Sequence, residues 1–166
     1  MNQRLKQFWS ALTAHVAAHE IMLVKRALPP AEFALFARMP RYDQRHCLDV
    51  YYALADAGVR DDIILRGALY HDTGKVDPQG RPVPLLWYGG LVIFKKLFPT
   101  IYCRLAASPD GLRHYFYYYE HHDRLGAELA AQADAPAEIV AMLRCYHDDD
   151  PADPRARVLK SIDELY

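Results

Sequence analysis

Apolar residues recur at intervals of three or four along most of this chain, the period of an amphipathic α-helix. The clearest run, which Pro29-Pro30 ends, consists of Leu5, Phe8, Leu12, Val16, His19 and Leu23. No segment alternates apolar and polar residues over a length typical of a strand. The pattern therefore predicts an all-α fold class, a bundle of about six to nine helices without a sheet.

Turn signals divide the rest of the chain into further helices. We expect them near residues 31–37, 42–57, 63–70, 84–107 with a break at Pro99, 112–132, 137–147 and 154–165. Gly58 is well placed as the left-handed residue that ends the second of these, and Asp61 is a typical N-cap for the third. Residues 76–83 have the composition of turns throughout.

Length and composition indicate one soluble globular domain. The chain has 166 residues, of which 52% are hydrophobic and 25% charged, so it can bury a core of its own. Its net charge of −1, with 20 basic and 21 acidic residues, argues against a protein that binds nucleic acid through bulk charge. The three cysteines form no CxxC motif, so we expect reduced thiols and a cytoplasmic location.

The most apolar stretch is 83–94 (VPLLWYGGLVIF), which Lys95-Lys96 ends. As a helix it would be about 18 Å long, well short of the roughly 30 Å hydrocarbon core of a bilayer, so we expect no transmembrane segment. Residues 84–98 also combine Trp, Phe and Lys, which suits a helix lying on a membrane surface or docking a partner. A wall over an active site and the contact of a homodimer are further interpretations of this segment.

Histidines and aspartates form the candidate chemistry. His71-Asp72 ends an apolar segment and is followed by Gly74 and Lys75. Adjacent residues of a helix project about 100° apart, so both can reach one metal only where the backbone turns, and we expect Gly74 to supply that turn. The other candidates lie on separate predicted helices: His46, His122, His147 and Asp163. Imidazole and carboxylate together suit divalent transition metals better than Mg²⁺.

The order of these residues resembles that of the HD-domain metal-dependent phosphohydrolase superfamily, whose hallmark H…HD…H…H…D is distributed over an all-helical bundle. Four local sequences are similar to family segments: RYDQRHCLDVYYAL, GALYHDTGK, EHHDRLGAELA and VLKSIDEL. The second is very similar to the hallmark ALLHDIGK, and the third to HE-x-x-GAE. The resemblance covers about residues 40–166 as the core of one domain, with 1–39 as a helical extension packed on it.

The resemblance implies a metal-dependent phosphohydrolase whose substrate is a nucleotide or a related small phosphorylated metabolite. Carried over by position, it implies that His46, His71, Asp72 and Asp163 bind a divalent ion (Mn, Fe, Co, Ni, Zn or Mg). His122 and His147 would either hold a second metal, bridged by Asp72, or contact the phosphate. The lone histidine of RCYHD, where many relatives carry a pair, favours one tightly held metal.

The resemblance also implies a choice between two adjacent histidines and the roles of three residues in catalysis. Of His121 and His122 we choose His122, which lies four residues before Gly126 as in the family. Asp72 would orient or deprotonate the attacking water. Lys75, placed at the mouth of the pocket, and Arg45 would hold the nonbridging phosphate oxygens. The alternative from another class is a regulatory module that binds metal or nucleotide without turnover.

Overall fold

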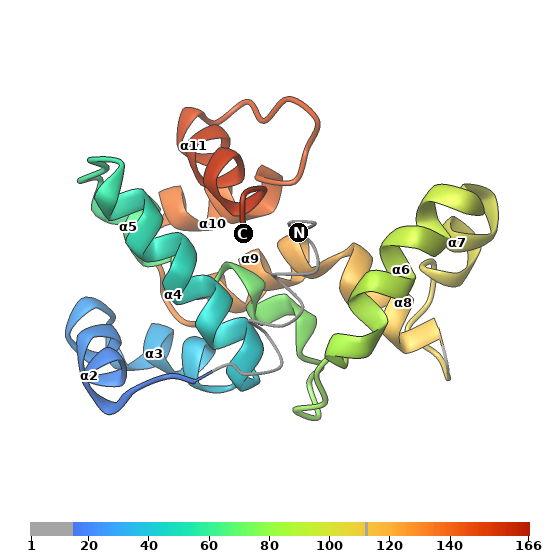
Figure 1. The fold of residues 1–166 in the computed structure, drawn as a ribbon, viewed down its shortest axis with the longest axis horizontal. Helices are drawn as coiled ribbons and strands as arrows, with labels where there is room; N and C mark the ends of the chain where they lie inside the picture. Colours follow the sequence, from blue (N-terminus) through green and yellow to red (C-terminus); the bar gives the residue numbers. More distant parts are fainter. Residues whose placement is uncertain (1–14, 112) are drawn as a thin grey trace.

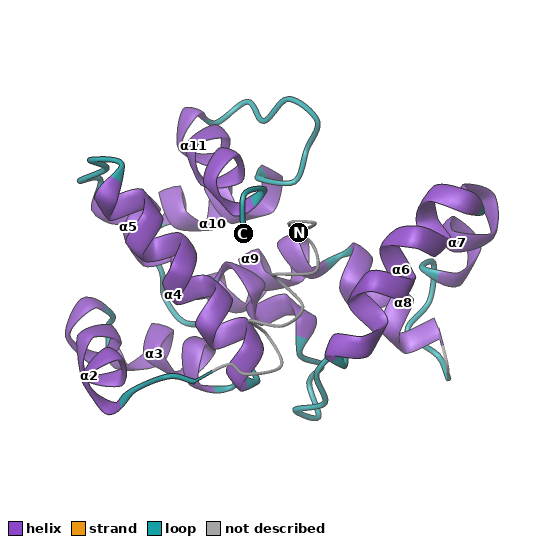
Figure 2. Cartoon of the chain, in the orientation of Figure 1, coloured by secondary structure: helices purple, strands orange, loops and turns teal. Residues whose placement is uncertain are grey.

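The computed structural model describes residues 15–111 and 113–166, which are helical over most of their length (Figures 1 and 2). The α-helices are α2 (Ala18–Ala27), α3 (Pro30–Ala37), α4 (Arg41–Asp56), α5 (Asp62–Ala68), α6 (Leu85–Leu97), α7 (Pro99–Leu105), α8 (Arg113–Glu120), α9 (His122–Gln132), α10 (Ala137–Cys145) and α11 (Pro154–Asp163). A 3₁₀-helix, η1 (His71–Lys75), follows α5. The described residues contain no strand, only an isolated bridge between Val76 and Pro82. The predicted all-α fold class is confirmed.

The predicted caps of two helices are confirmed, and they fix the ends of α4 and α5. Gly58 follows α4 with φ of +85°, a left-handed conformation that favours glycine. The Asp61 carboxylate accepts a hydrogen bond of 2.9 Å from the Ile63 backbone N–H at the start of α5. These two local features therefore fix where α4 ends and where α5, which leads into η1, begins.

The first predicted helix does not run unbroken from Leu5 to Leu23. Residues 15–17 are not helical, and the helix begins at Ala18. The Glu20 carboxylate accepts a hydrogen bond of 2.9 Å from the Ala17 backbone N–H, which marks this start. Leu5, Phe8 and Leu12 lie outside the described residues.

The predicted helix over 112–132 is two helices, α8 and α9, because the chain bends at His121 (φ −110°, ψ 15°). This bend raises the number of α-helices in the described ranges to ten, one above the predicted range. It coincides with a boundary between two hydrophobic clusters: Tyr115 and Phe116 of α8 belong to one, and Ala127 and Ala130 of α9 to the other. The apolar side chains of α8 and α9 therefore join different hydrophobic clusters.

The larger hydrophobic cluster joins side chains from α2 through α5 with α9, α10 and α11, so residues 16–39 share the core of the rest, while residues 1–14 lie outside the described part of the chain. The smaller one lies among α6, α7 and α8, and we call these helices, residues 85–120, the α6–α8 lobe. Val83, Leu91, Tyr102 and Ala106 form its buried centre. In Figure 1 the lobe extends to one side of the other helices. None of the described helices is both long and apolar enough to cross a bilayer.

Helix α9 packs directly against η1, and two glycines allow the close approach. A Cβ atom at Gly74 would overlap the His122 carbonyl and lie 2.7 Å from the Gly126 nitrogen. A Cβ atom at Gly126 would in turn lie 3.3 Å from the His71 carbonyl oxygen. Gly74 does not have a positive φ. The backbone turns here as the 3₁₀-helix η1, which contains Gly74, so glycine is needed for the contact with α9 and not for a left-handed conformation.

Candidate metal centre

Four of the predicted ligands lie together, although they come from three separate elements. His46 is on α4, His71 and Asp72 are on η1, and Asp163 ends α11. His46 Nε2 is 2.7 Å from Asp163 Oδ1 and 3.8 Å from Asp72 Oδ2. His71 Nε2 is 3.3 Å from Asp163 Oδ1 and 3.7 Å from Asp72 Oδ1. Two imidazole nitrogens and two carboxylates thus surround one small space.

The hydrogen bonds of His71 orient its ring toward this space. Its Nδ1 is 2.8 Å from the Ala68 carbonyl oxygen, an acceptor only, which assigns the proton to Nδ1 in the neutral ring. Nε2 then carries the lone pair, and it is fully buried without a hydrogen-bond partner of good geometry. A histidine whose Nδ1 is held by a backbone carbonyl and whose Nε2 has no such partner fits a metal ligand.

The two carboxylates of the cluster favour a positive charge between them. Burial alone would raise the pKa of Asp72, but Lys75, His71 and His46 outweigh burial and lower it below its usual value. Burial likewise opposes ionisation of Asp163, and the neighbouring His71 and His46 hold its pKa well below the ordinary value. Burial alone would lower the pKa of His71, but Cys47, Asp72 and Asp163 raise it well above its usual value. Two ionised, buried carboxylates beside two imidazoles form a donor set that suits a divalent cation, which would take the place of the His71 proton.

Lys75 is not at the mouth of a pocket, as the sequence led us to expect, but buried. Only 8% of the residue is exposed, and its Nζ donates a hydrogen bond of 2.7 Å to Asp72 Oδ2. The 3₁₀ turn of η1 brings residues three apart onto one side, which explains the contact. Burial alone would lower the pKa of the ammonium, but Asp72 and Asp43 raise it above its usual value, so Lys75 stays charged.

Asp43 is part of the same buried network, although the sequence analysis did not single it out. It is 2% exposed, and its Oδ1 accepts a hydrogen bond of 2.9 Å from the Tyr88 hydroxyl. Burial, opposed by Lys75, raises the pKa of Asp43 to about 7. Its position three residues before His46 puts both on one side of α4, and that helical spacing was the available signal.

His122 and His147 form a second group beside Asp72. The Nδ1 of His122 is 2.7 Å from the Tyr119 carbonyl oxygen, which repeats the arrangement of His71. Its Nε2 is 3.6 Å from Asp72 Oδ1 and 2.9 Å from His147 Nε2. Asp72 therefore lies between the two histidine groups. Burial, together with Lys75 and His147, lowers the pKa of His122 well below its usual value, which favours the neutral imidazole.

Tyr146 also contacts this group and was not identified from the sequence. Its hydroxyl lies 3.0 Å from His122 Nε2, and the residue is fully buried. The other histidine of the pair considered above, His121, is turned away: its Nε2 lies 3.1 Å from the Ala106 carbonyl oxygen at the end of α7. The structure therefore brings His122, and not His121, to Asp72.

Arg45 is not brought to the cluster in which we expected it. Its guanidinium forms ion pairs of 2.7 Å with Glu20 and 2.9 Å with Asp49. The reason is helical geometry: Arg45 precedes His46 on α4, so its side chain leaves the helix about 100° away from that imidazole. Two carboxylates already satisfy this guanidinium, and we withdraw the assignment of Arg45 to phosphate binding.

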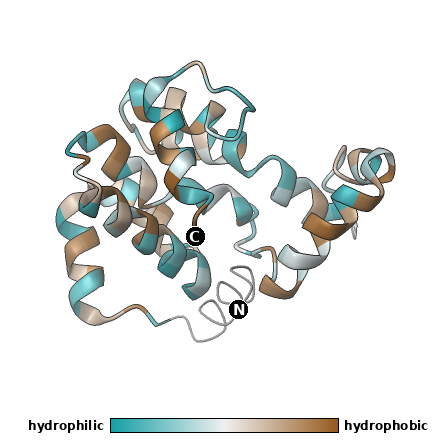
Figure 3. Ribbon diagram, turned by 45° about the horizontal axis from the view of Figure 1, so that its top comes forward, coloured by the Kyte–Doolittle hydropathy of each residue, from teal (hydrophilic) through white to brown (hydrophobic). Residues whose placement is uncertain are grey.

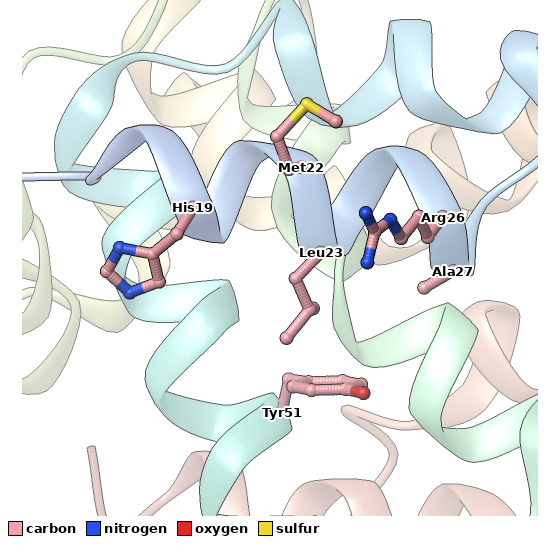
Figure 4. Close-up of a pocket in the computed structure, with 6 residues that line it drawn as sticks. All are labelled: His19, Met22, Leu23, Arg26, Ala27 and Tyr51. Carbon is pink, nitrogen blue, oxygen red and sulfur yellow. The ribbon is translucent and has the colours of Figure 1, made fainter.

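A hollow of about 570 Å³ lies between α2 and α4, apart from the histidine and aspartate cluster. Six residues line it: His19, Met22, Leu23, Arg26, Ala27 and Tyr51 (Figure 4). In Figure 4 the Leu23 side chain points toward the Tyr51 ring, and Arg26 lies beside them. The lining includes one imidazole and no carboxylate, so it does not offer a metal site.

Comparisons of the chain with protein-family models, with curated proteins and with solved structures gave no match.

Proposed function

We propose that this protein is a metal-dependent phosphohydrolase, a small member of the HD-domain superfamily that its sequence resembles. The observation that carries the proposal is the convergence of His46, His71, Asp72 and Asp163 from α4, η1 and α11. The Ala68 carbonyl oxygen holds Nδ1 of His71, which leaves the buried Nε2 facing Asp163 Oδ1 at 3.3 Å and Asp72 Oδ1 at 3.7 Å, the orientation of a metal-ligating histidine.

These four residues would hold the primary metal, with both imidazoles binding through Nε2. When bound, a divalent cation supplies a Lewis acid that offsets phosphate charge and lowers the pKa of water. The imidazole share of the donor set favours Mn, Fe, Co, Ni or Zn over Mg. Residues from three helices would be joined in this way, so binding should also stabilise the folded chain.

The side chains of the centre would have different roles in the reaction. Asp72 faces both histidine groups and would orient the attacking water or accept its proton. Lys75, held 2.7 Å from Asp72, would keep that carboxylate in place and offer a fixed positive charge to the anionic substrate. His122 and His147 would either hold a second metal with Asp72 or contact the phosphate.

The substrate in this proposal is a phosphoester, a nucleotide or a related small phosphorylated metabolite, on the ground of the resemblance. The test is a panel of phosphoesters assayed with Mn²⁺, Co²⁺, Ni²⁺, Zn²⁺ and Mg²⁺. We expect metal-dependent release of phosphate from at least one compound, and loss of that release in Asp72→Asn. The control is Asp49→Asn, which changes a carboxylate of α4 that pairs with Arg45 outside the centre. Metal binding without hydrolysis would instead favour a regulatory module.

The role of the second histidine group has a separate test, the metal content of His122→Ala. If His122 and His147 hold a metal, the wild type should bind about two ions per chain and the variant about one. If they contact phosphate, metal content should not change, and the substitution should mainly raise KM. Tyr146→Phe, which removes the hydroxyl 3.0 Å from His122 Nε2 but keeps the ring, is the matched control.

A further inference from the structure

Within residues 15–111 and 113–166, helix α6 has one apolar face that is packed and another that is exposed. The inner face is packed: Leu91 is buried in the smaller hydrophobic cluster, and the Tyr88 hydroxyl donates to Asp43. The outer face has Leu86, Ile93 and Leu97, whose exposed fractions are 76%, 58% and 63%. Spacings of seven and four residues put these three side chains along one side of the helix. Helix α6 therefore presents a stripe of exposed aliphatic side chains.

Two more exposed apolar residues follow the end of α6. Phe98 and Ile101 are also about half exposed, and Phe98 directly follows Leu97. We call these five residues the α6–α7 face: Leu86, Ile93, Leu97, Phe98 and Ile101. In Figure 3, hydrophobic stretches lie along the lobe that carries them. Single exposed apolar side chains are ordinary, but five large ones within sixteen residues, three of them on one side of α6, mark an interaction surface.

The charged residues of the segment that carries the α6–α7 face are all positive. Residues 84–107 contain Lys95, Lys96 and Arg104 and no acidic residue, whereas the whole chain has a net charge of −1. Lys95 is paired with Glu120 at 2.8 Å. Lys96 and Arg104 are exposed and form no ion pair within the part of the chain that the structure describes. The lobe is thus electropositive beside an acidic remainder, which would orient it toward an anionic surface.

We propose that the α6–α7 face docks on a lipid bilayer that contains anionic lipids. Its aliphatic and aromatic side chains would enter the region between headgroups and acyl chains, while Lys96 and Arg104 would contact lipid phosphates. A second copy of this chain is a poorer occupant, because a symmetric contact would bring the same unpaired cations of both copies together. The proposal concerns a surface outside the candidate metal centre and does not depend on turnover.

Co-sedimentation with vesicles tests the proposal directly. The probes are vesicles of phosphatidylcholine alone and vesicles in which a third of it is replaced by phosphatidylglycerol, each at low and at physiological salt. We expect binding to the anionic vesicles that weakens as salt rises, and little binding to the neutral ones. Absence of binding to the anionic vesicles, or equal binding to both kinds, would overturn the proposal.

Matched substitutions locate the surface. The variants are Ile93→Ser with Leu97→Ser for the apolar part and Arg104→Glu for the charge, each expected to weaken vesicle binding about tenfold or more. The controls are Met22→Ser on α2, a residue that is 50% exposed, and Arg144→Glu, an exposed arginine of α10, neither of which should change it. Unchanged melting temperatures would show that all variants are folded.

Two further results would contradict the proposal. One is vesicle binding that persists in both α6–α7 variants. The other is a dimer, measured by light scattering, that dissociates on the same substitutions, since the occupant would then be a second copy. The vesicle assay needs neither metal nor substrate, so its failure is distinguishable from failure of the proposed phosphohydrolase activity.

Discussion

The backbone carbonyl of His122 occupies the space in which a side chain at Gly74 would lie. This contact joins η1, which carries His71 and Asp72, to the first residue of α9. Both sides of this contact consist of backbone atoms, so the rotation of a side chain cannot relieve an overlap there. The separation of Asp72 and His122 is therefore set by a main-chain contact that only glycine allows.

Gly74→Ala should consequently destabilise the fold and displace the two histidine groups relative to each other. We expect a loss of about 2 kcal/mol or more in the free energy of unfolding, measured in urea, because overpacking here moves backbone. The control is Gly89→Ala in α6, where a Cβ would meet nothing within 4 Å. That change should stabilise the chain by about 0.5–1 kcal/mol. Equal effects of both would show that the close packing of η1 on α9 is unimportant.

A second prediction concerns pH and the N-cap of α5. A hydrogen bond from the Arg155 guanidinium lowers the pKa of Asp61 below its usual 3.8. Such a carboxylate stabilises the fold above its unfolded pKa, and the contribution disappears as pH falls through the folded value. Asp61→Asn keeps the cap without the charge. The stability of the wild type over this variant should be constant above about pH 5 and decline below about pH 4.

The control for the cap itself is Asp61→Ala, which should cost about 1 kcal/mol more than Asp61→Asn at neutral pH. A gap between wild type and Asp61→Asn that stayed constant down to about pH 2 would mean that the Arg155 contact does not stabilise the folded chain. Urea unfolding at a series of pH values measures both quantities.

The buried ion pair of Glu32 and Arg66 should be essential for stability. Glu32 is 1% exposed, is paired with Arg66 and accepts a hydrogen bond of 3.1 Å from the Tyr70 hydroxyl, one residue before η1. Arg66→Ala would leave the Glu32 carboxylate buried without a cation beside it, which we expect to cost about 3 kcal/mol in unfolding free energy. In the solvent-exposed pair of Arg124 and Glu128, Arg124→Ala should cost less than about 1 kcal/mol. Similar losses in both variants would contradict this difference.

The fold was predictable where a local signal determines the backbone. Gly58 and Asp61 act through their own conformation or one short hydrogen bond, so the sequence alone identifies them. The bend at His121 has no such signal, because neither proline nor glycine stands near it. The chain bends there as α8 and α9 join different hydrophobic clusters, and that tertiary cause is not visible in local sequence.

The candidate site was predictable to a similar extent. The resemblance identified the residues that the structure brings around Asp72. It could not reveal which ion pairs and hydrogen bonds the residues next to them form. Arg45 was expected in the site and is instead held by Glu20 and Asp49. Asp43 has the appearance of an ordinary acidic residue in the first turn of α4; its spacing of three from His46 was the one sequence signal, and its burial against Tyr88 shows its place in the network.

The central claim is that His46, His71, Asp72 and Asp163 together hold a divalent cation. Its most direct test is the metal content of the protein after equilibrium dialysis against Mn²⁺, with Asp163→Asn as the variant and Asp49→Asn as the control. We predict that the wild type and Asp49→Asn retain bound Mn²⁺ and gain melting temperature from it, whereas Asp163→Asn loses most of both. Equal Mn²⁺ content and equal melting temperatures in all three proteins, with and without chelator, would contradict the claim.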